Sequence, residues 1–115
     1  NGDGLADIII GAPSAAGGAG EAYIVFGSAS GFVSVLNVSS LNGTNGVLIS
    51  SGDSQAGFNY IGIGFSVAAA GDVNGDGVQD VIIGAPYAAS AAGEAYVVFG
   101  SASGFVSHLN LSSLD

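Results

Sequence analysis

Hydrophobic positions in this chain occur in short runs that glycine, serine, asparagine and aspartate interrupt. IIIGAP and VIIGAP are β-branched runs that end in Gly-Ala-Pro, while AYIVFG and AYVVFG combine β-branched with aromatic residues. GVLISSG and GFSVAAAGD are two further runs bounded by glycine. β-branched and aromatic residues favour strands, whereas frequent glycine and the lack of a 3.6-residue stripe disfavour helices. The pattern therefore predicts an all-β protein of short strands joined by turns.

The runs belong to an internal repeat. Residues 1–42 recur as residues 74–115, with roughly three-quarters of the aligned positions identical. The strands are ordered as the second, third and fourth of one unit, followed by the first, second and third of the next. We therefore divide the chain into a partial repeat, residues 1–42 (strands 2 and 3), and a second repeat, residues 43–115. Residues 43–52 are a candidate outer strand that completes the first unit.

The strands are largely apolar on both faces, which suits sheets packed between other sheets, as in the blades of a β-propeller. A propeller contains about 4–8 blades, so one and a half repeats cannot close a ring. A repeat unit also buries its faces only against its neighbours. We therefore expect neighbouring repeats, or copies of the same chain, to complete a propeller of four-stranded sheets.

Charge narrows the range of partners. The chain has no Lys or Arg and nine Asp and Glu residues, for a formal charge of −9. It cannot neutralise phosphates with basic side chains, so nucleic acid is not expected as a partner, whereas cations are attracted. No apolar run approaches the roughly 20 residues of a membrane-spanning helix, and membrane insertion is not expected. The absence of Cys excludes disulfides and thiolate zinc sites.

The candidate chemistry lies in an acidic loop, residues 72–80. Oxygen-bearing groups fall at alternate positions of this loop, and the candidate ligands are Asp72, Asn74, Asp76, the Val78 carbonyl and Asp80. Ca²⁺ is bound by about six to eight oxygen atoms, and the two glycines of the loop tolerate the positive φ of a tight turn. Carboxylates so close together repel one another unless a cation is present. The loop therefore predicts a calcium site.

The first copy of the repeat carries a shorter form of this loop. Its candidate ligands are Asn1, Asp3, the Leu5 carbonyl and Asp7. It lacks an equivalent of Asp72, so we expect it to bind calcium more weakly if Asn1 is a true terminus.

The acidic loops allow two other interpretations. Asn-Gly and Asp-Gly pairs also form hairpin turns without any metal. An EF-hand loop requires a bidentate Glu at its twelfth position and flanking helices, but the twelfth residue counted from Asp72 is Ile83. Asp80 would have to close the site instead.

The acidic loop and the strands around it resemble a known family. DVNGDGVQDVIIGAP followed by GEAYVVFG is similar to the FG-GAP repeat of integrin α-subunit propellers and of bacterial surface proteins. The matching elements are Gly84-Ala85-Pro86 with Phe99-Gly100, Gly11-Ala12-Pro13 with Phe26-Gly27, and the strand-like Gly64-Phe65-Ser66-Val67-Ala68. The resemblance implies a β-propeller with four-stranded antiparallel blades. It also implies one Ca²⁺ in the hairpin between the first and second strands of a blade.

Two functions are compatible with these features. The first is a calcium-binding structural or adhesion module with a protein or glycan partner, and the second is a glycan-binding, lectin-like propeller. An enzyme is not expected, because Glu21 and Glu94 are equivalent by repeat and suit a structural role. Phe58, Tyr60 and Tyr87 are candidates for exposed aromatic contacts. Calcium sites with dissociation constants of about 0.1–1 mM fill outside cells, which favours an extracellular or cell-surface location.

Overall fold

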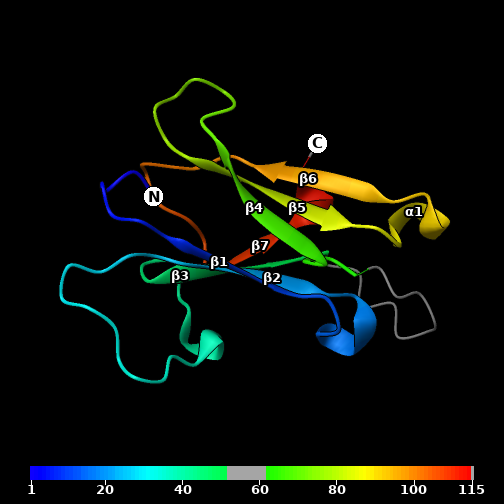
Figure 1. The fold of residues 1–115 in the computed structure, drawn as a ribbon, viewed down its shortest axis with the longest axis horizontal. Coiled ribbons are helices and arrows are strands. Elements are labelled where there is room, and N and C mark those ends of the chain that lie inside the picture. Colours follow the sequence, from blue (N-terminus) through cyan, green and yellow to red (C-terminus); the bar gives the residue numbers. More distant parts are fainter. Residues whose placement is uncertain (52–61, 115) are drawn as a thin grey trace.

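The structure, a computed structural model, describes residues 1–51 and 62–114. It contains two small β-sheets that pack against each other (Figure 1). No helix in the described part of the chain has the length and apolar character that crossing a membrane requires.

The first sheet holds the strands of the first copy and one strand from the second. Its order is β1-β2-β3-β7, with β1 at Ile8–Ala12, β2 at Glu21–Val25, β3 at Gly46–Ser50 and β7 at His108–Asn110. The first three strands form an antiparallel meander, and β3 lies within residues 43–52, the candidate outer strand of the first unit.

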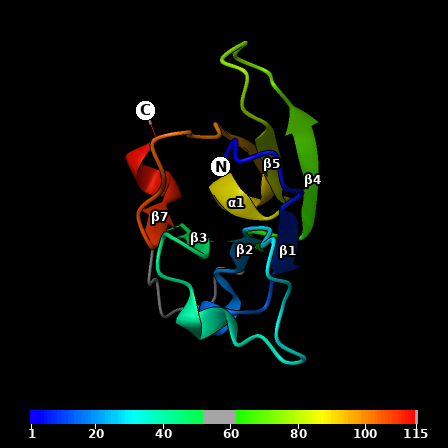
Figure 2. The same ribbon diagram turned by 90° about the vertical axis from the view of Figure 1, so that its left-hand side faces the viewer.

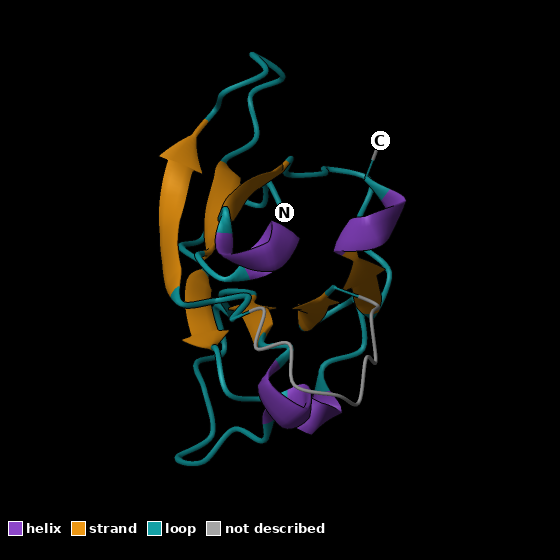
Figure 3. Cartoon of the chain, turned by 90° about the vertical axis from the view of Figure 1, so that its right-hand side faces the viewer, coloured by secondary structure: helices purple, strands orange, loops and turns teal. Residues whose placement is uncertain are grey.

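The second sheet has the order β4-β5-β6 and is antiparallel throughout. Strand β4 spans Ser66–Gly71, β5 spans Asp80–Ala85 and β6 spans Glu94–Val98. One turn of helix, α1 at Ala88–Ala91, follows β5. In the described residues, turns of 3₁₀ helix lie in the connections at Ala16–Gly18, Val38–Ser40 and Leu111–Ser113. Figure 3 draws the helical turns in purple beside the strands.

The two sheets share one hydrophobic core. Their strands are apolar on both faces, so one face of each sheet can pack against the other sheet. The buried residues come from both copies and include Ile24, Val47 and Ile49 from the first sheet and Ile83, Ala85 and Val98 from the second. Ile63, just before β4, is also fully buried in this core. The sequence-based prediction of an all-β, blade-like fold is confirmed, since the described residues form two sheets that pack through one core.

One feature of the topology is not expected from the sequence. β7 belongs to the second copy but pairs in parallel with β3 of the first sheet. The sequence predicted antiparallel sheets made by consecutive strands, and a parallel pairing between residues so distant has no local signal. Figure 2 shows β7 beside β3, away from the rest of the second copy.

The glycine of the Gly-Ala-Pro motif allows a close contact between strands. A Cβ atom at Gly11 would overlap the carbonyl oxygen of Gly64, which belongs to the segment that leads into β4. At the equivalent Gly84, the Cβ would instead meet the hydroxyl of Ser66. A side-chain hydroxyl can rotate away, whereas a backbone carbonyl between two packed sheets cannot.

The two glycines are therefore expected to respond differently to the same substitution. Gly11→Ala should lower the free energy of unfolding by about 1–3 kcal/mol, the usual cost of overpacking a tight contact. Gly84→Ala should change the free energy by less than about 1 kcal/mol, since Ser66 can give way. Urea denaturation followed by circular dichroism measures both variants, and equal losses would contradict this account of the motif.

Candidate metal-binding loops

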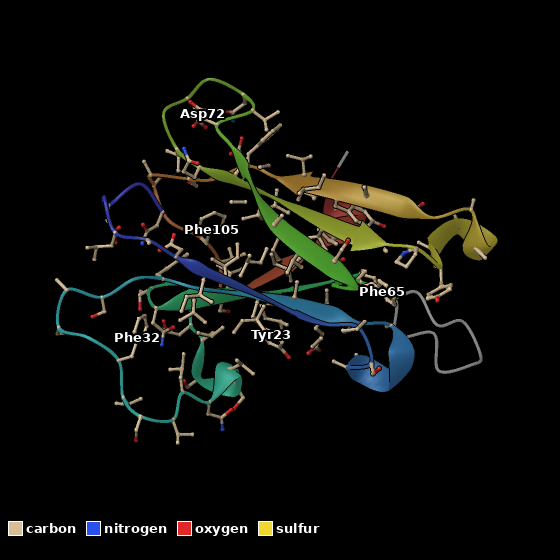
Figure 4. All side chains as sticks on the ribbon, viewed as in Figure 1. Tyr23, Phe32, Phe65, Asp72 and Phe105 are labelled. Carbon is tan, nitrogen blue, oxygen red and sulfur yellow. The ribbon has the colours of Figure 1, made fainter. Side chains whose placement is uncertain are left out.

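The acidic loop of the second copy connects β4 to β5. β4 ends at Gly71 and β5 begins at Asp80, so residues 72–79 form the connection of a β-hairpin. The loop projects beyond the end of the sheet in Figure 1, and Figure 4 labels Asp72 at its start. Each turn-forming glycine, Gly75 and Gly77, has positive φ, of 75° and 86°. The glycines thus give the loop the tight path that the sequence predicts.

The carboxylate of Asp72 lies inside the loop and is held by backbone amides. Its Oδ1 accepts hydrogen bonds from the amides of Gly75 at 2.7 Å and Asp76 at 3.0 Å. Its Oδ2 accepts one from Gly77 at 2.9 Å. Asn74 and Asp76 are linked to each other through the Asn74 amide at 2.9 Å, and Asp76 also accepts from the amide of Val78 at 2.8 Å.

Asp80 closes the loop from a fully buried position. Its Oδ2 accepts a hydrogen bond from the amide of Val73 at 2.7 Å, at the start of the loop. Its Oδ1 accepts one from the amide of Gly100 at 2.8 Å, just after β6. The bond from Gly100 is the main cause that lowers the pKa of Asp80, while burial opposes it. Because these donors favour the charged carboxylate, Asp80 ties three segments of the sheet together as an anion.

The first copy repeats this arrangement, except that the amino group of Asn1 takes the place of the backbone amide of Val73. Asp7 accepts a hydrogen bond from the amide of Gly27 at 2.9 Å, and its other oxygen pairs with the amino group of Asn1 at 3.2 Å. Asp3 accepts from the amide of Leu5 at 2.9 Å and from the Asn1 side chain at 2.9 Å. The Leu5 amide is the main cause that lowers the pKa of Asp3.

The Phe-Gly motif supplies the partner of the last aspartate in both loops. Gly27 and Gly100 donate to Asp7 and Asp80, and a Cβ atom at Gly100 would overlap the carbonyl of Gln79 in the loop. The motif therefore needs glycine because the loop lies directly against it. Sequence reasoning assigned Asp80 to metal binding alone and missed this anchoring role, although the fixed spacing from each Asp to its Phe-Gly motif could have suggested it.

The donor set of the loops suits a hard cation, because it contains only carboxylate, amide and carbonyl oxygens and the chain has no Lys or Arg to compete. In the described residues, however, no three acidic or histidine side chains gather around a common point. The carboxylates of the second loop are turned to backbone amides instead. The residues that could hold a metal remain those that the sequence predicts. They are Asp72, Asn74, Asp76, the Val78 carbonyl and Asp80 in the second loop, with Asn1, Asp3, the Leu5 carbonyl and Asp7 in the first.

A cavity of about 540 Å³ lies between the sheets beside the two loops. Asp7 and Asp80 line it, together with apolar side chains that include Ile9, Phe26 and Phe105. Both loops thus meet at one end of the interface between the two sheets.

The other candidate residues have structural partners or lie elsewhere. The hydroxyl of Tyr23 donates to Glu21 on the same strand, and Tyr96 donates to Glu94 in the same way. Tyr87 packs edge-on against Phe65, with ring centroids 6.0 Å apart. Phe58 and Tyr60 lie outside the described residues.

The Tyr23–Glu21 pair predicts a pH dependence in alkaline solution. Burial, with a smaller contribution from Glu21, raises the pKa of Tyr23 to about 12. The pair therefore stabilises the fold fully below about pH 10, the pKa of an unfolded tyrosine, and loses this contribution as the pH rises toward 12. Tyr23→Phe should remove this part of the alkaline loss. Urea unfolding at several pH values from about 9 to 11 measures this loss. If the free energy of unfolding falls with pH equally steeply in the parent and in the variant, the assignment is wrong.

Two packed, mainly antiparallel sheets, a Gly-Ala-Pro motif in each copy and an acidic hairpin loop define a β-propeller type of repeat protein. The sequence model of the FG-GAP repeat matches residues 1–25 and 64–98, together just over half of the chain. The chain belongs to the FG-GAP repeat family.

Two curated relatives share part of the sequence. Integrin alpha pat-2 of Caenorhabditis briggsae and integrin alpha pat-2 of Caenorhabditis elegans are each 57% identical to it over 42 residues. The matched segment covers 36% of this chain and 3% of each relative. No solved structure matches the chain.

Proposed function

We propose that this chain is a calcium-binding structural module of an integrin-like β-propeller, used in adhesion at the cell surface or outside the cell. One observation carries the proposal. Each acidic loop ends in an aspartate that also binds the glycine of the Phe-Gly motif, at 2.9 Å for Asp7 and 2.8 Å for Asp80. A cation held by the loop would therefore act on the edge of the whole sheet and not only on a flexible turn.

The candidate ligands of the second loop have two different roles in holding the cation. Asp80 is fixed by two backbone amides and sets the base of the loop. Asp72, Asn74 and Asp76 lie on the exposed part, where their oxygens can exchange backbone amides for a metal at low cost in packing. Calcium supplies positive charge that offsets the repulsion among the three carboxylates.

Adhesion is supported by the names of the relatives, both of which are integrin α chains. Calcium sites of this type are weak enough to fill at extracellular rather than cytosolic concentrations, which supports the proposed location. The ligand of the module belongs to the protein or glycan class, and neighbouring repeats supply the other blades.

Glycan binding is the second candidate, because Phe65 and Tyr87 form an exposed aromatic pair of the kind on which sugar rings can stack. Thermal unfolding in calcium, in chelator and in magnesium tests the primary proposal. A glycan array, read with and without calcium, separates the two candidates: an adhesion scaffold responds to calcium but binds no free glycan.

A further inference from the structure

Two nearly identical segments of this chain lie in different surroundings. The first arm, residues 32–41, reads FVSVLNVSSL, and the second arm, residues 105–114, reads FVSHLNLSSL. Each arm follows the Phe-Gly motif of its own copy. The arms differ only at Val35 against His108 and at Val38 against Leu111. Eight of their ten residues are identical, so a comparison of the two arms reports mainly on what surrounds them.

The second arm is docked on the sheet of the preceding copy. Its strand β7 pairs in parallel with β3, in the register Leu48↔His108, Ile49↔Leu109 and Ser50↔Asn110. The amide of Leu48 donates to the carbonyl of Ser107 at 3.0 Å. The side chains of Ser50 and His108 are joined by a hydrogen bond of 2.7 Å. The arm thus covers the outer edge of the first sheet, which would otherwise expose unpaired backbone groups.

Apolar contacts hold the same arm in place. The ring of Phe105 lies 5.8 Å from that of Phe26, centroid to centroid. Leu111 is only 2% exposed and belongs to the core shared by both sheets. The backbone of the arm also approaches Gly43 closely, since a Cβ atom there would lie 2.6 Å from the carbonyl oxygen of Phe105. Glycine at position 43 therefore leaves the space that the arm needs.

The first arm has the same apolar side chains but no such support. Phe32 is 53% exposed and Leu36 is exposed as well, whereas their counterparts in the second arm, Phe105 and Leu109, are half-buried. Residues 35–37 form no strand. In Figure 4 the label of Phe32 lies on a long loop that leaves the sheet on the left side of the view, away from the core. Exposed large apolar side chains in one short segment mark a surface that docks elsewhere.

We propose that the first arm docks, as a parallel strand, on the outer strand of an FG-GAP repeat on its N-terminal side. Each repeat would then pair with the outer strand of the repeat before it, as the second arm pairs with the first copy. The partner is a strand like Gly46–Ser50, with a free edge and a glycine equivalent to Gly43 ahead of it. The inference rests on the proposed array of consecutive repeats, but it does not rest on calcium.

A second copy of this chain fits this role less well. Its own β3 edge is already covered by its own second arm. A preceding repeat in a continuous chain presents an uncovered outer strand at high effective concentration. This difference selects the preceding repeat as the occupant.

The first test compares the two arms within the unaltered chain by hydrogen exchange. The register and the bond from Leu48 to Ser107 turn the amide of Leu109 toward β3. The amides of Leu48 and Leu109 should therefore exchange at least about tenfold more slowly than the amide of Leu36, the counterpart of Leu109 in the first arm. Gly43→Ala should remove this protection, because the added methyl group occupies the place of the Phe105 carbonyl. Gly31→Ala is the matched control, since Gly31 also has positive φ but no atom within 4 Å of the place that a Cβ would occupy. Equal exchange in both arms of the parent would overturn the proposal.

The second test supplies the missing partner. A chain in which a copy of residues 1–73 precedes Asn1 continues the repeat without interruption, because Asn1 is equivalent to Asn74. This copy contains the outer strand together with the β1 and β2 strands of its sheet. In this longer chain the amide of Leu36 should gain protection of about tenfold or more, reaching that of Leu109. A Leu36 amide that exchanges as fast as in the parent chain would overturn the proposal.

The calcium proposal and the arm proposal fail in different ways. Protection of the first arm in chelator as well as in calcium supports the arm even if calcium does not bind. A calcium-dependent melting temperature with an unprotected first arm supports the metal site and overturns the arm.

Discussion

Calcium is expected to raise the melting temperature of this chain, and magnesium to raise it much less. A ligand that binds only the folded state stabilises it by about 2.7 kcal/mol at a hundredfold excess over its dissociation constant. For a chain of this length, that corresponds to a rise on the order of 10 °C. Magnesium demands a more rigid octahedral site and gives up its water reluctantly, so a loop of this kind favours calcium. Differential scanning calorimetry in calcium, magnesium and chelator measures the shifts.

Asp76→Asn is the variant that separates metal binding from folding. Its carboxylate lies in the exposed part of the loop, where one oxygen accepts from the Val78 amide at 2.8 Å and the other from Asn74. The amide of Asn keeps the shape but removes a charge, so the variant should retain most of its melting temperature in chelator and lose most of the calcium-dependent rise. Glu94→Gln removes an equal charge outside the loops and should keep the full rise.

Asp80→Asn is less suitable for this purpose. The amide nitrogen of Asn cannot accept one of the two hydrogen bonds that Val73 and Gly100 donate, and at this fully buried position water cannot replace it, as it can at the exposed Asp76. This variant should therefore melt at a lower temperature even in chelator. If calcium and chelator give the same melting temperature for the parent chain, the acidic loops are turns and the metal part of the proposed function is wrong.

Ile83→Ala is expected to cause a large loss of stability. Ile83 is 0% exposed and lies in the core that both sheets share. Shortening a fully buried isoleucine to alanine costs about 2–5 kcal/mol, because apolar contacts are lost and a cavity is left. Since the core joins the two sheets, both should lose protection together in hydrogen exchange.

Ile82→Ala is the matched control for this prediction. Ile82 is the neighbour of Ile83 on β5, points to the opposite face of the strand and is 39% exposed. The same truncation there should cost less than about 1 kcal/mol. Urea denaturation of both variants measures the difference. Similar losses would show that the two faces of β5 are equally buried in solution, which would point to a further sheet packed on the outer face.

Much of the fold could be predicted from the sequence. β-branched runs bounded by glycine become β1, β2, β5 and β6, because strand propensity and the turn-forming role of glycine act over a few residues. The position of the acidic loop in a hairpin also follows from the order of these runs. The candidate ligands could be named from their oxygens and spacing, but not the direction in which each carboxylate points.

The role of single residues depended on contacts across the fold. Asp80 anchors its loop to Gly100, twenty residues further along the chain, and the equal spacing in the two copies is compatible with this contact but does not by itself show it. Gly11 and Gly84 hold equivalent places in the sequence, yet one faces a backbone carbonyl and the other a hydroxyl. The atom that each glycine faces differs because β1 packs on the second repeat, whereas β5 pairs with β4 of its own repeat.

The sequence by itself determined the repeat, the strands and the acidic loops. The spacing of hydrophobic residues and the choice of turn residues act over short stretches of chain. Only the tertiary structure decided which sheet each strand joins and what covers its edge. The two arms show the reason most directly. Nearly the same ten residues form a parallel strand at 108–110 and an exposed loop at 35–37, because the outer strand that pairs with the second arm lies some sixty residues earlier and the first arm has no such strand beside it.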